Sequence, residues 1–263
     1  MTAELRNVSK VFTDPRRGKG LVALKDVSLR VEEGEFLCLV GASGCGKSTT
    51  LNLLAGFEAP SQGEVTYQGE RVRGPSPDRG VVFQEFSLYP WMSVLQNVMF
   101  SLQGKERQED RAMEQLRLVG LEDFANSRPN DLSGGMRQRV AIARTLAMGP
   151  GLLLMDEPFG SLDEQTRRKL DNEVLKLWQR ERKTVVFVTH NIDEALMLGT
   201  RVVLMSPSPG RIEKEWRIGL PWPRDLSSPE IVGMKAEIIS RLQACPCANG
   251  APVSMLGFDE EGT

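Results

Sequence analysis

Short, almost entirely apolar runs alternate with longer amphipathic stretches along the chain. Residues 36–40, 152–155 and 185–189 are runs of strand length, which is typical of strands buried on both faces of a sheet. Residues 164–182 contain neither Gly nor Pro, and their apolar positions recur at helical spacing. This succession of strand, helix and strand predicts an α/β fold with a largely parallel sheet.

Weaker patterns flank this centre. Residues 21–31 alternate between apolar and polar positions, which predicts a strand that ends in a turn. Elsewhere the hydrophobic pattern predicts strands at 202–204 and 211–218 and helices at 47–55 and 231–242.

Residues 90–148 differ from the rest because helix-like patterns follow one another there without a strong strand signal. The predicted helices cover residues 94–102, 108–118 and 134–148. We therefore expect a helical subdomain inserted into the α/β core. Residues 243–263 are predicted to form a poorly ordered tail.

Composition narrows the protein class. The chain has 263 residues, of which 40% are hydrophobic and 26% are charged, which excludes a collagen-like or mostly disordered protein. Its net charge of −2 gives no electrostatic footprint for nucleic acid. The apolar runs are far shorter than the about 20 residues that a spanning helix needs, and residues 1–10 lack a signal-peptide core. We therefore expect a chain that neither crosses a membrane nor carries a Sec-type export signal.

Four cysteines are too few and too unevenly placed for a disulfide scaffold: Cys38, Cys45, Cys245 and Cys247. We interpret them as reduced thiols of a cytosolic protein. The alternative for Cys245 and Cys247 is a metal or redox pair, but no second Cys or His pair stands at ligand spacing.

A glycine-rich loop directly follows the strand predicted at 36–40. Residues 41–48 read Gly-Ala-Ser-Gly-Cys-Gly-Lys-Ser and fit the pattern G-x-x-x-x-G-K-[ST]. Glycines let backbone N–H groups approach phosphate oxygens, and the following helix adds its positive N-terminus. Lys47 supplies a charge toward the β- and γ-phosphates, and Ser48 a hydroxyl for Mg²⁺. The position between strand and helix favours triphosphate binding over a chance match.

Polar residues end two other predicted strands. Asp156 and Glu157 follow residues 152–155, and ligands of open α/β sheets bind beyond the carboxyl ends of strands. We expect Asp156 to hold Mg²⁺ through its water shell and Glu157 to orient the attacking water or accept its proton. The alternative is a solvated acidic turn. His190, the only histidine, is either structural or a contact of the γ-phosphate or water, which we favour partly on the resemblance below.

Residues 132–138, Leu-Ser-Gly-Gly-Met-Arg-Gln, open another helix. Ser133 is a good N-cap, and the two glycines leave backbone N–H groups uncovered. One face of this helix is apolar: Met136, Val140, Ala143 and Ala147. The residues alone do not decide between a capped core helix and a second anion-binding helix start.

Together these motifs resemble the ordered motif set of ATP-binding cassette (ABC) ATPases. The set comprises residues 41–48, Gln84 after Val81-Val-Phe, residues 132–138, residues 152–157, Ser161-Leu-Asp163 and His190. The resemblance covers about residues 2–242, and the segment 132–138 is very specific to that family. It implies a P-loop NTPase core with an N-terminal antiparallel β subdomain and an inserted helical subdomain.

The resemblance also implies individual roles. Phe12 would stack on adenine, Gln84 would reach Mg²⁺ and the attacking water, and Asp163 would lie at a dimer interface. Ser133, Gly134 and Gly135 would bind the γ-phosphate of ATP held by the partner subunit's loop. The implied ATP-binding set is Phe12, Gly41, Ala42, Ser43, Gly44, Cys45, Gly46, Lys47, Ser48, Thr49, Ser133, Gly134, Gly135 and Asp163. The implied Mg²⁺ set is Ser48, Gln84 and Asp156, and the catalytic set is Lys47, Gln84, Glu157 and His190.

Residues 74–94 and 220–225 are similar to importer ATPases of the nitrate/sulfonate/taurine group. This implies a homodimer with ATP at its interface, attached to the cytoplasmic face of a membrane through a separate permease that works with a solute-binding protein. The apolar residues Phe86, Leu88, Tyr89, Pro90 and Trp91 are either a local hydrophobic cluster or a groove for a permease helix.

Two features depart from the usual pattern or invite a test. Asn191 follows the histidine where the family often has Asp, and Cys45 lies within the loop, where oxidation or alkylation would block ATP. One competing hypothesis is an ABC ATPase that acts on DNA or the ribosome, which the single cassette and the net charge disfavour. Another is a kinase of small metabolites, which residues 132–138 disfavour.

Overall fold

The computed structural model describes residues 2–13, 20–102, 104, 106–160 and 162–244. Its centre is a six-stranded sheet in the order β10-β9-β3-β8-β7-β6. Neighbouring strands are parallel except β9 and β10. The strands are β3 (Phe36–Val40), β6 (Arg79–Val82), β7 (Leu152–Asp156), β8 (Thr184–Val188), β9 (Arg201–Met205) and β10 (Ile212–Arg217). This confirms the α/β fold with a largely parallel sheet.

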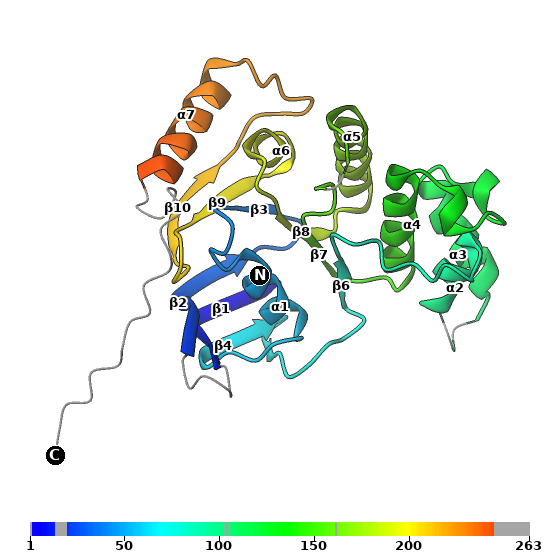
Figure 1. Ribbon diagram of the computed structural model, residues 1–263, viewed down its shortest axis with the longest axis horizontal. Helices are drawn as coiled ribbons and strands as arrows, with labels where there is room; N and C mark the ends of the chain where they lie inside the picture. The colour runs from blue at the N-terminus through cyan, green and yellow to red at the C-terminus, as the bar shows by residue number, and fades with distance from the viewer. Residues whose placement is uncertain (1, 14–19, 103, 105, 161, 245–263) are drawn as a thin grey trace.

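Both faces of the central sheet are covered, which explains the continuous apolar run of β3. Side chains alternate between the faces of a strand. Phe36, Cys38 and Val40 therefore join a core with helices α5, α6 and α7, whereas Leu37 and Leu39 join a core with α1 and the N-terminal sheet (Figure 1). The helices are α1 (Lys47–Ala55), α5 (Glu164–Glu181), α6 (Ile192–Leu198) and α7 (Pro229–Ala244).

The N-terminal sheet is antiparallel, with the strand order β2-β1-β4-β5. Its strands are β1 (Ala3–Thr13), β2 (Gly20–Val31), β4 (Gln62–Tyr67) and β5 (Glu70–Arg71). The hydrophobic pattern predicts only β2. In β1 the pairing with β2 shifts between Leu5 and Val8, and Asn7 between them has a left-handed φ of 47°. Such a bulge breaks the two-residue alternation by which a strand is found in a sequence.

Helices α2, α3 and α4 form a lobe beside the central sheet, on the right in Figure 1. Its elements are α2 (Val94–Phe100), α3 (Gln108–Leu118), the 3₁₀ turns η1 (Glu122–Phe124) and η2 (Pro129–Asp131), and α4 (Gly134–Ala147). The lobe has its own apolar core, which buries Val140, Ala143 and Ala147 of α4, with Met136 packed against it. The apolar face predicted for this helix is therefore confirmed.

The chain leaves the sheet through β10 and ends its described part in α7, which begins two residues before the predicted start at 231. Among the described residues, no helix combines the length and the apolar character needed to cross a bilayer. Residues 245–263, with Cys245, Cys247 and most of the predicted tail, lie outside the described residues.

Gly56 ends α1 and lies against the segment that leads to β6. Its φ is 84°, and a Cβ at this position would collide with the carbonyl group of Gly74. Gly69, in the turn between β4 and β5, has almost the same φ of 85° but no atom within 4 Å of its Cβ position. The two glycines therefore separate backbone strain from close packing.

We expect Gly56→Ala to destabilise the fold more than Gly69→Ala. A left-handed alanine costs about 1–2 kcal/mol at either position, and the collision at Gly56 adds about 1–3 kcal/mol. Urea denaturation of both variants and of the unchanged chain measures the difference. Equal losses of unfolding free energy in the two variants would show that the Gly74 backbone moves aside without a measurable cost.

Candidate functional site

The phosphate loop, residues 41–46, joins the carboxyl end of β3 to α1. Gly44 and Gly46 are left-handed, with φ of 77° and 94°. A Cβ at Gly46 would lie 2.5 Å from Leu24 Cδ2 and 3.1 Å from the Ala23 carbonyl oxygen, so glycine is required there. The first N–H groups of a helix have no partners within the helix. The loop therefore leads into an anion-binding helix start.

Lys47 folds back over this loop. Its ammonium group donates hydrogen bonds to the carbonyl oxygens of Gly41 at 2.8 Å and Ala42 at 3.1 Å. The residue is only 6% exposed. An ammonium group has three donors and no acceptor, and these bonds hold it at the loop.

Ser48 and Asp156 bring two hard oxygen donors together. Ser48 lies in the first turn of α1, and Asp156 lies at the carboxyl end of β7. The Ser48 hydroxyl donates a hydrogen bond to Asp156 Oδ1 at 3.1 Å. Burial raises the pKa of Asp156, and the hydrogen bond from Ser48 opposes this shift. A cation at this point would offset the cost of burying the carboxylate. Mg²⁺ binds through a few protein oxygens and the substrate's phosphates, and this donor pair fits that preference.

Glu157 lies at the centre of a second group of side chains. Its φ is 42°, and its backbone N–H donates to the Val188 carbonyl oxygen at 2.9 Å, at the end of the neighbouring strand β8. His190 Nδ1 lies 3.0 Å from Glu157 Oε2. Because an ionised carboxylate only accepts hydrogen bonds, Nδ1 carries the proton in this contact and Nε2 is the ring nitrogen available to a ligand.

Gln84 approaches the same carboxylate. A Cβ built on Gly160 would lie 3.5 Å from Gln84 Nε2 and 3.6 Å from Glu157 Oε2, so both side chains converge on this glycine. Of the residues predicted from sequence for catalysis, Gln84, Glu157 and His190 thus lie together, and Lys47 belongs to the phosphate loop.

Ser133 caps α4, as its hydroxyl accepts a hydrogen bond from the Met136 N–H at 3.3 Å. A Cβ on Gly134 would lie 2.9 Å from Leu162 Cδ2, and one on Gly135 would lie 2.8 Å from Thr166 Cγ2. The two glycines therefore let α4 begin close to the start of α5. This confirms the capped core helix and leaves its anion-binding role a prediction. In Figure 1, α4 lies in the helical lobe, away from α1.

Asp163 and Phe12 have partners within the chain. Asp163 caps α5 by accepting the Thr166 N–H at 2.9 Å, and this hydrogen bond lowers the pKa of Asp163. Phe12 lies near the end of β1, is 37% exposed, and has Lys10 Nζ 4.8 Å from its ring centroid. Its ring is thus accessible, as adenine stacking requires. Ser161 lies outside the described residues.

The aromatic segment before α2 is both packed and exposed. The ring of Tyr89 packs on Phe100 at 4.7 Å and on Trp91 at 5.5 Å between centroids, while Trp91 remains 66% exposed. The fully buried Asn97 holds this segment: it accepts the Tyr89 N–H at 2.8 Å and donates to the Ser93 carbonyl oxygen at 2.9 Å. The local-cluster interpretation is correct for Tyr89, and Trp91 stays available to a partner.

Sequence reasoning missed Asn97 and also the buried acids Asp171 and Glu194. A signal near Asn97 exists, because Ser93 and Gln96 form a capping box that fixes where α2 begins. The two acids give no such signal, since an acid in an amphipathic helix usually faces solvent. Asn191 caps α6 by accepting the N–H groups of Asp193 and Glu194, so it performs the capping that Asp would.

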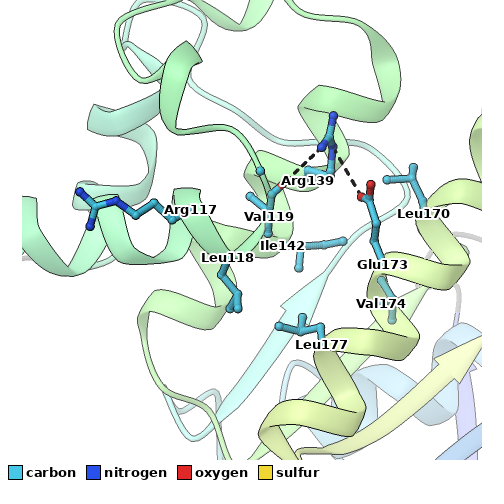
Figure 2. Close-up of a pocket in the computed structure, with 10 residues that line it drawn as sticks. Arg117, Leu118, Val119, Arg139, Ile142, Leu170, Glu173, Val174 and Leu177 are labelled. Atoms are coloured by element: carbon cyan, nitrogen blue, oxygen red, sulfur yellow. Dashed lines mark hydrogen bonds and ion pairs between the residues drawn. The ribbon is translucent and has the colours of Figure 1, made fainter.

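A cavity of about 280 Å³ lies between the helical lobe and α5. Figure 2 shows Arg139 there, reaching toward Val119 on one side and Glu173 on the other. Its guanidinium donates to the Val119 carbonyl oxygen at 3.0 Å and lies 3.7 Å from the Glu173 carboxylate. The lining contains no residue of the phosphate loop, so this cavity is a seam between lobe and core and a different place from the nucleotide site.

Comparison with known protein families shows that residues 24–160 match the ABC transporter family. Several relatives are similar over most of the chain. The nitrate import ATP-binding protein NrtD of Synechocystis sp. is 48% identical over 84% of each chain. The taurine import ATP-binding protein TauB of Roseobacter denitrificans is 48% identical over 81% of each. An uncharacterized ABC transporter ATP-binding protein of Methanocaldococcus jannaschii is 47% identical over 91% of each.

Solved structures agree with this match. The dimeric structure of a post-hydrolysis state of an ATP-binding cassette bound to ADP and Pi is 38% identical, with a TM-score of 0.72. The match covers 83% of this chain and 100% of the chain in that structure. A component of the cbiONQ transporter complex from Clostridium perfringens, 24% identical with a TM-score of 0.75 over 92% and 98% of the chains, shares the fold.

The thiol of Cys45 lies beneath the phosphate loop. The residue is fully buried, and its sulfur lies 2.6 Å from the Cβ position of Gly41 and 3.8 Å from Lys47 Nζ. Burial raises the pKa of the Cys45 thiol, against the opposing charge of Lys47. A smaller fraction of the thiol is then ionised at pH 8. Both its burial and its protonation therefore slow alkylation of Cys45.

We expect iodoacetamide at pH 8 to modify Cys45 at least roughly tenfold more slowly in the folded protein than in urea, because buried thiols react slowly. Mass spectrometry of the loop peptide measures the modified fraction over time. Equal rates in the folded and unfolded chains would place the thiol in solvent.

Proposed function

Since the chain belongs to the ABC transporter family of ATP-binding proteins, we propose that it hydrolyses ATP to drive import of a small solute through a separate permease. The observation that carries the proposal is the convergence at one sheet edge of the loop with Lys47, the Ser48–Asp156 pair and the Glu157–His190 pair. A phosphate cradle, a cation site and a carboxylate near an imidazole are the parts that phosphoryl transfer to water needs.

ATP binds with its β- and γ-phosphates on the loop, residues 41–46, and on the first N–H groups of α1, including those of Ser48 and Thr49. The Lys47 ammonium exchanges the carbonyl oxygens of Gly41 and Ala42 for phosphate oxygens. Phe12 stacks on adenine. Ser48, Gln84 and Asp156 would hold Mg²⁺, which would neutralise charge on the phosphates.

Glu157 orients the attacking water and accepts its proton as the water oxygen bonds to the γ-phosphorus and the bond to the β–γ bridging oxygen breaks. His190 donates from Nδ1 to Glu157 Oε2, which fixes the ring and directs Nε2 to the γ-phosphate or water. Gln84, beside the same carboxylate, contacts the water from its other side. Positioning and charge stabilisation supply the rate enhancement.

Two chains complete each site. Ser133, Gly134 and Gly135 of one subunit bind the γ-phosphate on the other subunit's loop, and Asp163 lies at the interface. The dimeric cassette with ADP and Pi supports this arrangement. Head-to-tail pairing accounts for a phosphate-binding helix start in the lobe while the phosphate loop lies at the carboxyl end of β3.

The partners follow from the importer relatives. The nitrate and taurine import proteins support a nitrate-, sulfonate- or taurine-like solute, delivered by a solute-binding protein. Trp91 and its neighbours, held by Asn97, form the surface that receives a permease helix. The chain then sits on the cytoplasmic face of the membrane through its permease and binds no nucleic acid.

We expect Glu157→Gln to reduce ATP turnover by at least about 10²-fold, because an amide cannot accept the water's proton. Nucleotide binding remains, since Glu157 does not touch the phosphate loop, and the ATP-bound dimer becomes long-lived. Phosphate release and size-exclusion chromatography with Mg-ATP measure the two effects. An exposed control, Glu164→Gln, leaves turnover unchanged; full turnover by Glu157→Gln would refute the role.

Mixing two inactive variants tests the shared site. Lys47→Ala removes the phosphate cation, and Ser133→Asp keeps the cap on α4 but repels the γ-phosphate. Half of the dimers in a 1:1 mixture are mixed, and each contains one intact site. The mixture should therefore exceed the sum of the two variants and reach up to about a quarter of the unchanged rate. No gain on mixing would place the whole site within one chain.

A further inference from the structure

Asp171 of α5 and Glu194 of α6 are buried acids that have no part in the mechanism above. They are 2% and 5% exposed. Each has one carboxylate oxygen without a hydrogen-bond donor, Asp171 Oδ1 and Glu194 Oε1. Buried polar atoms are nearly always hydrogen-bonded, so these two orphaned oxygens require an explanation.

The charges around the two acids do not provide it. Arg167, one turn before Asp171, is the cation that acts on both acids, but its guanidinium donates to the carbonyl oxygens of Phe159 at 3.2 Å and Leu162 at 3.0 Å. His190 acts on Glu194 more weakly. From β3, the buried Cys38 thiol faces both acids and has its own pKa raised by burial and by Glu194.

Two further charged residues near α6, Arg224 and Asp193, interact with groups other than the two acids. Arg224 donates to the carbonyl oxygens of Leu196 at 2.7 Å and Gly199. Asp193 pairs with Lys235 of α7 at 2.6 Å. The acids must therefore satisfy each other.

Burial raises the pKa of Asp171 to about 9, and the charge of Glu194 and a hydrogen bond to Glu194 add to this shift. Burial raises the pKa of Glu194 as well. Two buried carboxyl groups side by side do not both ionise near neutral pH. One retained proton supplies a donor on one acid for an acceptor on the other, which accounts for both orphaned oxygens.

We propose that Asp171 and Glu194 share a single proton and so form a positioning pair that holds the turn carrying His190 against α5. The proposal rests on the role given to His190 in hydrolysis. Asp171 and Glu194 touch neither substrate nor metal, and they act through the residues that flank the histidine.

The connection to His190 is direct. Glu194 Oε2 accepts the hydroxyl hydrogen of Thr189, and Thr189 Oγ1 accepts the backbone N–H of Asn191 at 3.0 Å. These are the two neighbours of His190. A cavity of about 10 Å³ lies between Glu194 of the pair and the hydrolytic residues Glu157 and His190, all three of which line it. This is about the space of one water molecule.

On the other side the pair is joined to the start of α5. Arg167 and Asp171 are one turn apart on that helix, and Arg167 holds the carbonyl oxygens of the turn that leads to Asp163. Loss of the shared proton would set two buried negative charges against each other and push α6, with the His190 turn, away from α5. The pair therefore fastens the histidine segment to the segment at the proposed dimer interface.

A stability measurement tests the shared proton without reference to ATP. The folded chain keeps a proton that the unfolded chain loses above pH about 4, so the unchanged protein loses stability as pH rises toward 9. Asp171→Asn is nearly isosteric and donates its amide hydrogen to Glu194 without titrating. We expect the melting temperature of this variant, relative to the unchanged chain, to rise by at least about 3 °C between pH 5 and pH 8.

Glu181→Gln is the matched control, because it removes one acid from the exposed end of the same helix. Its difference from the unchanged chain should stay constant over this pH range. A constant difference for Asp171→Asn as well would overturn the shared proton.

The pH dependence of ATP turnover tests the positioning role. With saturating Mg-ATP, kcat of the unchanged chain should fall about twofold near pH 9 relative to Asp171→Asn, with KM unaffected, because half of the pairs have then lost their proton. Coincident pH profiles would overturn positioning even if the melting data support the proton. A failure of the proposed function, seen as full turnover by Glu157→Gln, would leave the melting result standing.

Discussion

The burial of β3 on both faces is the constraint on which the functional geometry depends. All five of its residues are buried, and Phe36 packs edge-on against Trp178 and beside Phe187, each with 5.8 Å between ring centroids. A shift of one residue would exchange the side chains that face the two cores, so the register is strongly fixed. The strand therefore delivers Gly41 and the phosphate loop to one place at the sheet edge.

The register between β7 and β8 fixes the positions of the acids and the histidine at the same edge of the sheet. Asp156 of β7 pairs with Val188 of β8, and the next residue, Glu157, bonds back to Val188. Two residues beyond Val188 stands His190, which is why its imidazole meets the Glu157 carboxylate. Parallel strands in register thus bring two separate stretches of sequence together, and the contact between Glu157 and His190 follows from that register.

This explains what could be predicted from sequence. Asp156 ends β7, Glu157 and His190 follow within two residues of β7 and β8, and the loop that leads to Lys47 follows β3. The ends of parallel strands meet at one edge. Three elements show too little periodicity in the sequence to be predicted: β1, which is bulged, β5, which has two residues, and α6, which has only seven. Asp171 and Glu194 could not be predicted, because only the packing of α5 against α6 shows that both are buried together. The proposed role of Ser133 rests on the motif alone, since within the chain its hydroxyl only caps α4.

The fold of Lys47 over its own loop has an energetic consequence for nucleotide binding. The ammonium group bonds to the carbonyl oxygens of Gly41 and Ala42, so it ties the start of α1 to the beginning of the loop. In the proposed binding mode, phosphate oxygens replace these two carbonyl acceptors and little new backbone has to be ordered. Ordering a flexible loop would reduce the net free energy of nucleotide binding. With a loop that is already ordered, more of this binding free energy can contribute to association of the subunits.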